Sequence, residues 1–255
     1  MSRTIVMVHG MWGGGHVWRN LRPYFEHRGF TVHTPDLRHH AVAPDTPPPS
    51  GLATVSLLDY AADLEAQIRA LPEAPVLIGH SMGSLLVQML AARGLGKAAI
   101  LLTPAAPSGI IAIRFSVLRA FMRILGRWAF WRRAHRMDFG ASRYAMLNCM
   151  PEDQARGEHA RFVHESGRAL AEIAFWYLDA KHAARANPKN VTCKMLVVAG
   201  DKDRITPASV CRAVARRYRG ADYREYAGHS HFLISEPGWQ DIAADLDAWL
   251  TKALA

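Results

Sequence analysis

Gly79-His80-Ser81-Met82-Gly83 lies where two contrasting segments of the chain meet. Residues 74–78, Ala-Pro-Val-Leu-Ile, are apolar and opened by a proline, which predicts a short buried strand. Residues 84–92 are rich in helix-forming and apolar side chains, which predicts a helix. The two glycines flank the serine at minus two and plus two, where a Cβ would collide with the neighbouring backbone. The sequence therefore predicts a serine held at a sharp turn between a strand and a helix.

This G-x-S-x-G spacing, in its strand–turn–helix context, resembles the nucleophile elbow of the α/β-hydrolase superfamily. The resemblance implies an α/β fold with a mostly parallel central sheet, flanked by helices and carrying an inserted helical lid. It covers nearly the whole chain except the lid, and it is stronger for the fold and the catalytic residues than for the substrate.

Length and composition agree with such a fold. At 255 residues, half of them hydrophobic, the chain suits one large α/β domain with an inserted subdomain. No stretch reaches the roughly 18 uninterrupted apolar residues of a membrane-spanning helix. The chain enters a strand at Thr4 without the features of a secretory signal. Its three cysteines form no C-x-x-C pair, which argues against a disulfide framework or a zinc site. We therefore expect a cytoplasmic protein.

The alternation of strand and helix patterns is interrupted once along the chain. The two patterns alternate up to Thr103, and they resume at Lys194. Between these points several helical patterns follow one another without a strand signal. We therefore expect a hydrolase core made of residues 1–103 and 190–255, and a helical lid or cap made of residues 104–189.

A serine nucleophile needs a base within hydrogen-bond reach and an acid that holds this base in one tautomer. In the superfamily the order along the chain is serine, acid, histidine. The resemblance assigns Ser81 as the nucleophile, Asp203, in a G-x-x-D-x-x-x-P turn, as the acid, and His229, which follows a glycine, as the base. Two neighbours compete for these roles, Asp201 for the acid and His231 for the base.

The loop after the first strand, residues 9–18, begins with a His-Gly pair and contains four glycines. These glycines are out of register with the dinucleotide-binding fingerprint. By resemblance to the superfamily, the backbone N–H groups of Met11 and Met82 form the oxyanion hole. The side chains expected in the substrate pocket are those of Trp12, Phe115, Trp128, Trp176 and His231.

Most of the formal charge of +9 lies in the expected lid, where residues 104–189 contain fourteen basic and seven acidic side chains. Within residues 110–131, apolar side chains recur every three or four positions, and Arg119, Arg123 and Arg127 lie four apart on another side, which predicts an amphipathic helix. Two interpretations stay open: a lid helix packed over the pocket, and a helix that docks weakly on an anionic membrane or lipid interface. No recognition motif accompanies the charge, so we expect no nucleic acid partner.

These residues together predict a serine hydrolase that cleaves carboxylic esters, either small or medium acyl esters or lactones, through an acyl-enzyme. This chemistry needs no cofactor or metal, and the adjacent His39 and His40 form no metal-ligand pattern. Two alternatives stay open: another reaction of the same triad, such as C–C hydrolysis, perhydrolysis or cyanohydrin cleavage, and a non-catalytic protein that binds a ligand. We expect a monomer or a homodimer.

Overall fold

The computed structural model describes residues 3–255, and Met1 and Ser2 lie outside the described residues. The main sheet has six strands in the order β2-β1-β3-β4-β7-β8, and every neighbouring pair is parallel. The strands are β1 (Thr4–Val8), β2 (Thr31–His33), β3 (Val76–His80), β4 (Ala98–Leu102), β7 (Lys194–Gly200) and β8 (Asp222–Tyr226). The parallel sheet implied by the sequence is thereby confirmed.

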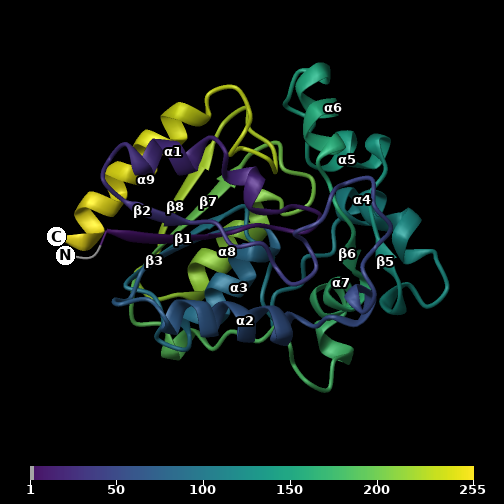
Figure 1. Ribbon diagram of the computed structural model, residues 1–255, viewed down its shortest axis with the longest axis horizontal. Coiled ribbons are helices and arrows are strands. Elements are labelled where there is room, and N and C mark those ends of the chain that lie inside the picture. The colour runs from purple at the N-terminus through teal and green to yellow at the C-terminus, as the bar shows by residue number, and fades with distance from the viewer. Residues whose placement is uncertain (1–2) are drawn as a thin grey trace.

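Helices cover both faces of this sheet (Figure 1). One face carries α1 (Leu21–Glu26) and α9 (Trp239–Leu254), and the other carries α2 (Leu57–Arg69), α3 (Met82–Ala91) and α8 (Ala208–Arg217). Successive residues of β1 alternate between the two cores: Ile5 and Met7 pack with α1 and α9, whereas Val6 and Val8 pack with α2, α3 and α8. Because both of their faces are buried, the central strands β1, β3, β4 and β7 are largely apolar along their length, whereas the edge strands β2 and β8 contain exposed polar residues.

Capping residues set where the helices begin. α2 begins after Ser56, because the Ser56 hydroxyl accepts from the Leu58 N–H at 3.2 Å and the Ser56 N–H donates to Asp59 Oδ2 at 2.8 Å. The residues before it form the 3₁₀ turn η2 (Leu52–Thr54). Before α1, the chain forms the 3₁₀ turn η1 (Gly15–Trp18).

The chain between β4 and β7, residues 103–193, forms an insert that lies beside one end of the main sheet (Figure 1). Its helices are α4 (Phe115–Leu125), α5 (Phe139–Ala145), α6 (Glu152–Ala160) and α7 (Gly167–Ala174), with the 3₁₀ turns η3 (Phe130–Arg132), η4 (Trp176–Leu178) and η5 (Pro188–Asn190). It also contains two antiparallel strands of two residues each, β5 (Ala134–His135) and β6 (Glu165–Ser166). The sequence did not predict these strands, because two residues carry no periodic pattern.

The helix α4 is shorter than the one expected over residues 110–131. Arg114 is extended, with φ −139° and ψ 155°, so the helix begins only at Phe115. It ends before Gly126, a residue type with low helix propensity, and Ala129 then adopts a left-handed φ of 53°. Trp128 therefore lies on a turn beyond the helix. Among residues 3–255, no helix is both long and apolar enough to span a membrane.

Buried hydrogen bonds tie one part of the insert to the core. Glu165, on β6, contacts His40 Nε2 at 3.1 Å and accepts from the Tyr60 hydroxyl at 2.7 Å. Glu172, on α7, accepts from the Ser56 hydroxyl at 2.8 Å. The core groups that contact these carboxylates come from the loop after β2 and from the start of α2, so β6 and α7 are attached to the sheet domain.

The helix α4 has different partners. Arg123 forms an ion pair with Asp138 at 2.9 Å, and Arg119 lies over the ring of Tyr144, so its polar contacts are with other parts of the insert. Its contact with the core is apolar, through Phe121 against the ring of Trp12. The polar attachments described for β6 and α7 thus have no counterpart on α4 in the described chain.

Candidate active site

Ser81 lies between the end of β3 and the start of α3, as the strand and helix patterns predict. Its backbone has φ 55° and ψ −120°, a strained conformation for a residue with a Cβ. The Ser81 N–H donates to Leu102 O at 3.0 Å, and the Ser81 O accepts from the Ala105 N–H at 3.0 Å. The end of β4 therefore holds the serine in the conformation of a nucleophile elbow.

The two flanking glycines are required by close backbone contacts. A Cβ on Gly79 would lie 2.5 Å from Gly83 O. A Cβ on Gly83 would collide with Val8 O at the end of β1. Only glycine at both positions lets α3 start so close to β1 and β3. The sequence indicates the same reason for the two glycines, a collision of a Cβ with the neighbouring backbone.

Asp203 pairs with His231 in the described structure. His231 Nδ1 and Asp203 Oδ2 lie 2.8 Å apart, and the two side chains are 1% and 0% exposed. Asp203 follows β7, and His231 lies in the loop between β8 and α9. With Nδ1 donating to the carboxylate, Nε2 of His231 carries the lone pair that can accept a proton.

The surroundings of Asp203 favour its ionised form. Oδ1 accepts from the N–H groups of Ile205 and Thr206, each at 2.8 Å, and the Thr206 hydroxyl lies 2.8 Å from Oδ2. Burial alone would raise the pKa, but the contact with His231 and the hydrogen bonds from Thr206 outweigh it, and the pKa of Asp203 lies below its ordinary value. A carboxylate in this state can stabilise a protonated imidazole.

His229, the base expected from the sequence, has a different partner. Its Nδ1 lies 3.1 Å from Glu236 Oε2, and Glu236 also accepts from the Ser230 N–H at 2.8 Å. The expected pairing of Asp203 with His229 is therefore wrong, and the competing residue, His231, forms it instead. The physical reason is that the loop contains its own buried carboxylate, which satisfies the first histidine and fixes the turn before the second.

The competing acid, Asp201, is used in a turn: it accepts from the Gly228 N–H at 2.7 Å. The adjacent histidines also have no common ligand, since His40 contacts Glu165 while His39 lies on an exposed turn with φ 69°. Among residues 3–255, no three His, Cys, Asp or Glu side chains are grouped so that they could hold a metal ion.

Two side chains hold the backbone of His231. His80 Nε2 donates to His231 O at 2.8 Å, and the Thr103 hydroxyl donates to the same oxygen at 3.1 Å. Burial first, and the neighbouring His231 second, lower the pKa of His80 to about 3, so His80 is neutral near pH 7. The two imidazole rings lie 5.0 Å apart. Because His80 directly precedes Ser81, this contact positions His231 beside the elbow.

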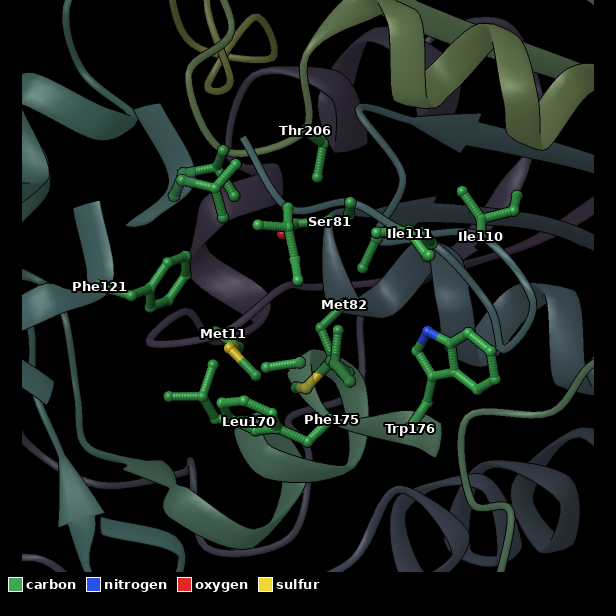
Figure 2. A pocket seen from close by; sticks show the side chains of 18 of the residues that line it. Met11, Ser81, Met82, Ile110, Ile111, Phe121, Leu170, Phe175, Trp176 and Thr206 are labelled. Atoms are coloured by element: carbon green, nitrogen blue, oxygen red, sulfur yellow. The ribbon is translucent and has the colours of Figure 1, made fainter. Parts of the chain in front are cut away.

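Met11 and Met82, the expected oxyanion donors, line the same cavity as Ser81 (Figure 2). Met82 is the first residue of α3, so its N–H has no acceptor within the helix. Met11 lies in a turn that is closed by the Gly13 N–H and Gly10 O at 3.3 Å, and this bond does not use the Met11 N–H. Both N–H groups are thus in positions from which an oxyanion hole could be built.

A cavity of about 480 Å³ opens beside Ser81 (Figure 2). The insert supplies most of its wall, and the side chains drawn in Figure 2 around the serine are nearly all apolar. The Ser81 and Thr206 hydroxyls are the polar groups nearest to the chemistry, and no charged side chain is among the lining residues of the described chain. This volume is typical of a site for a small molecule.

Of the side chains expected in the pocket, Trp12 and Trp176 line this cavity, and His231 lies outside its wall in the pair with Asp203. Phe115 and Trp128 do not line it: they are 79% and 84% exposed, so their expected place in the pocket is wrong.

The helix α4 explains this error, because it is apolar on two faces. The stripe read from the sequence comprises Ile111, Phe115, Leu118, Met122, Leu125 and Trp128, and all of these except Leu125 are exposed. The second stripe, Val117, Phe121 and Leu125, lines the cavity. Its four-residue spacing is a signal that sequence reasoning could have used and missed.

Comparison with known proteins agrees with this architecture. A sequence model described as the alpha/beta hydrolase family matches residues 5–243. A monoacylglycerol lipase of Mycolicibacterium smegmatis is 27% identical over 266 aligned residues, which cover 98% of this chain and 89% of the lipase.

Solved structures show the same fold. The monoacylglycerol lipase of Paleococcus ferrophilus has a TM-score of 0.73 and 21% identity, covering 98% of this chain and 94% of its own. An esterase from Exiguobacterium antarcticum has a TM-score of 0.74 and 17% identity, with 98% and 92% covered. Tomato methylketone synthase I has a TM-score of 0.74 and 16% identity, with 99% of both chains covered.

Proposed function

Because the chain belongs to the α/β-hydrolase family, we propose that it is a carboxylic ester hydrolase with Ser81 as nucleophile, His231 as base and Asp203 as acid. The observation that carries this proposal is the buried 2.8 Å contact between Asp203 and His231, beside a serine in a strained strand-to-helix turn. Two of the similar proteins are named as a monoacylglycerol lipase and an esterase, which supports the same class of reaction.

In the proposed mechanism, Ser81 Oγ attacks the ester carbonyl carbon while Nε2 of His231 takes its proton. The negative charge that develops on the carbonyl oxygen is stabilised by the N–H groups of Met11 and Met82, where one such donor is typically worth about 3 kcal/mol of the barrier. Asp203 stabilises the imidazolium. The tetrahedral intermediate then expels the alcohol, which takes the proton from His231, and water hydrolyses the acyl-enzyme by the same steps.

The cavity indicates the class of substrate. An acyl chain is apolar and uncharged, and it matches a wall in which only hydroxyl groups interrupt the apolar surface near Ser81. We therefore assign neutral esters with a small or medium acyl chain, linear or closed as a lactone, as the substrates. The insert acts as the lid of this site over residues 104–189, since its apolar side chains form most of the cavity wall beside the serine.

The triad is tested with p-nitrophenyl esters of graded chain length and three variants. Ser81→Ala and His231→Ala should each lower kcat by roughly 10⁴-fold or more, because each removes one member of a unit that transfers a proton. His229→Ala is the matched control two residues away, and its kcat should stay within about tenfold of wild type, since its partner is Glu236. If His229→Ala abolishes turnover and His231→Ala does not, the assignment is reversed. Equal turnover by wild type and Ser81→Ala would remove the proposed function.

A further inference from the structure

Large exposed apolar side chains are concentrated on the insert. In residues 3–255 every large hydrophobic residue that is highly exposed lies between positions 111 and 178, including Phe115 and Trp128 at 79% and 84%. The set comprises Ile111, Ile113, Phe115, Leu118, Met122, Trp128, Trp131, Tyr177 and Leu178. We call this set the docking face. Hydrophobic side chains gathered in this way on one part of a surface mark an interaction site.

The docking face is surrounded by positive charge. Residues 104–137 contain seven arginines and no aspartate or glutamate. The exposed ones are Arg114, Arg119, Arg123, Arg127, Arg132 and Arg133. Within the described chain only Arg123 among these six forms an ion pair, and its partner Asp138 is itself part of the insert. The charge is therefore largely uncompensated, and an anionic partner would complement it.

The docking face is continuous with the mouth of the cavity. Ile111, Ile113, Leu118 and Tyr177 belong to the docking face and also line the cavity that contains Ser81. An apolar molecule leaving a surface bound to this face would thus pass over apolar side chains until it reached the serine. The docking face and the cavity are two ends of one apolar path.

We propose that the docking face binds the surface of an anionic phospholipid bilayer, and that ester substrates enter the cavity from that bilayer. In an anionic bilayer the arginines can pair with the headgroups while the apolar side chains enter the hydrocarbon beneath them. The composition of the docking face therefore matches such a surface. A nucleic acid could bind the arginines and stack on the aromatic rings, but it has no apolar surface that would bury Ile111, Ile113, Leu118 and Met122. The part concerning substrate entry rests on the proposed function; the binding does not.

The test measures co-sedimentation of the full chain carrying Ser81→Ala with vesicles of phosphatidylglycerol and phosphatidylcholine, compared with vesicles of phosphatidylcholine alone. We expect binding to rise at least tenfold with the anionic lipid and to fall as KCl increases from 0.05 to 0.5 M. Arg114→Gln with Arg127→Gln should weaken binding about 25-fold, at roughly fivefold for each arginine near the bilayer. Arg216→Gln with Arg219→Gln, on exposed positions at the end of α8, is the charge-matched control and should leave it unchanged.

The apolar part of the docking face is tested by fluorescence. Trp128 should enter the interface, so its emission should shift to the blue with anionic vesicles, and Trp128→Phe should lose most of this shift. Phe115→Ser should weaken binding without loss of thermal stability, because this side chain is mostly solvent-exposed. With Ser81 intact, Trp128→Phe and Phe115→Ser should hydrolyse a water-soluble short ester at the same rate as wild type. This result would distinguish an effect on docking from an effect on catalysis.

Three results would overturn the proposal. The first is equal binding to both kinds of vesicle. The second is tighter binding of a single-stranded oligonucleotide that displaces the protein from vesicles. The third is a stable dimer that Phe115→Ser dissociates, which would make a second copy of the chain the partner. Failure of Ser81→Ala to lower ester hydrolysis would contradict the proposed function but would leave the vesicle measurement as a valid test of binding.

Discussion

Thr103 is a strained residue at the centre of the proposed triad. It has φ 42°, which is rare for a β-branched side chain, and it is fully buried at the end of β4. Its hydroxyl donates to His231 O, and its carbonyl oxygen lies 2.9 Å from the Thr206 hydroxyl. Thr206 also contacts Asp203, so Thr103 is linked to the base and the acid. We regard it as a positioning residue.

Thr103→Val keeps the shape of the side chain and removes the hydroxyl. We expect kcat to fall about tenfold, equivalent to ~1.4 kcal/mol, with KM nearly unchanged, because the imidazole is held less firmly in its reactive orientation. Steady-state kinetics on a short ester measure both constants. Thr103→Ser restores the hydroxyl and should recover most of kcat. A lower melting temperature with unchanged kcat in the valine variant would indicate a structural role only.

At the same scale, the choice between His229 and His231 shows where sequence reasoning stops. Both histidines follow β8, and each has a carboxylate within reach, Glu236 or Asp203. Which one pairs with Asp203 depends on the path of a short loop, which residue types and spacing do not determine. One signal was available in the sequence: His231 is followed by three apolar residues, 232–234. The structure buries all three, so His231 directly precedes a segment of the hydrophobic core.

At the scale of elements, the contact between His40 and Glu165 joins the loop after β2 to β6. Burial lowers the pKa of His40, but the charge and hydrogen bond of Glu165 outweigh it, and the pKa is raised above its ordinary value near 6.5. The folded state therefore holds this proton more tightly than the unfolded chain does. The stabilisation is fully present below about pH 6.5 and is lost as the pH rises through the raised pKa.

His40→Gln should accordingly cost more stability at pH 5.5 than at pH 9. We expect the difference between wild type and variant in free energy of unfolding to be larger by about 1.5 kcal/mol at the lower pH, the size of a hydrogen bond to a charged group. Urea denaturation at the two pH values measures it. His39→Asn, at the exposed neighbouring position, is the control and should show no such dependence. A difference that stays constant with pH would mean that His40 is neutral throughout.

The elements themselves were predictable to different degrees. β3, α3 and β7 are buried and flanked by clear turn residues, so their patterns were sufficient. The helix α4 was predicted too long, because its apolar spacing continues past Gly126 although the backbone does not. The pairing of β5 with β6 joins positions far apart in the sequence and is set by tertiary packing around Glu165, which no local pattern reports.

At the scale of the whole molecule, the insert is attached unevenly to the core. Glu165 and Glu172 connect β6 and α7 to the sheet domain by buried hydrogen bonds, whereas α4 has apolar contacts and exposed arginines. Local opening requires less free energy where fewer buried contacts are broken. We expect amides of α4 to exchange with deuterium at least tenfold faster than those of α7, measured by mass spectrometry of peptides. The buried α3 is the slow reference, and equal protection of α4 and α7 would contradict the prediction.

The whole architecture was predictable because the pentapeptide around Ser81 specifies a strand, a turn and a helix at once, and the alternating segments on both sides agree with it. The shape of the cavity beside Ser81 was not predictable from the sequence. Its wall comes mostly from the insert, and the helices of the insert pack against the core through side chains that are distant in the sequence. Phe121 against Trp12 is an example of such a contact.

The order of the strands along the chain has a consequence for the biosynthesis of the protein. In the proposed triad the serine follows the third strand of the chain, whereas the acid and the base follow the last two strands of the main sheet. A ribosome therefore releases the nucleophile long before the groups that activate it. An unfinished or truncated polypeptide carries an inert hydroxyl, and the hydrolytic power of the molecule arises only when its final segment has joined the sheet.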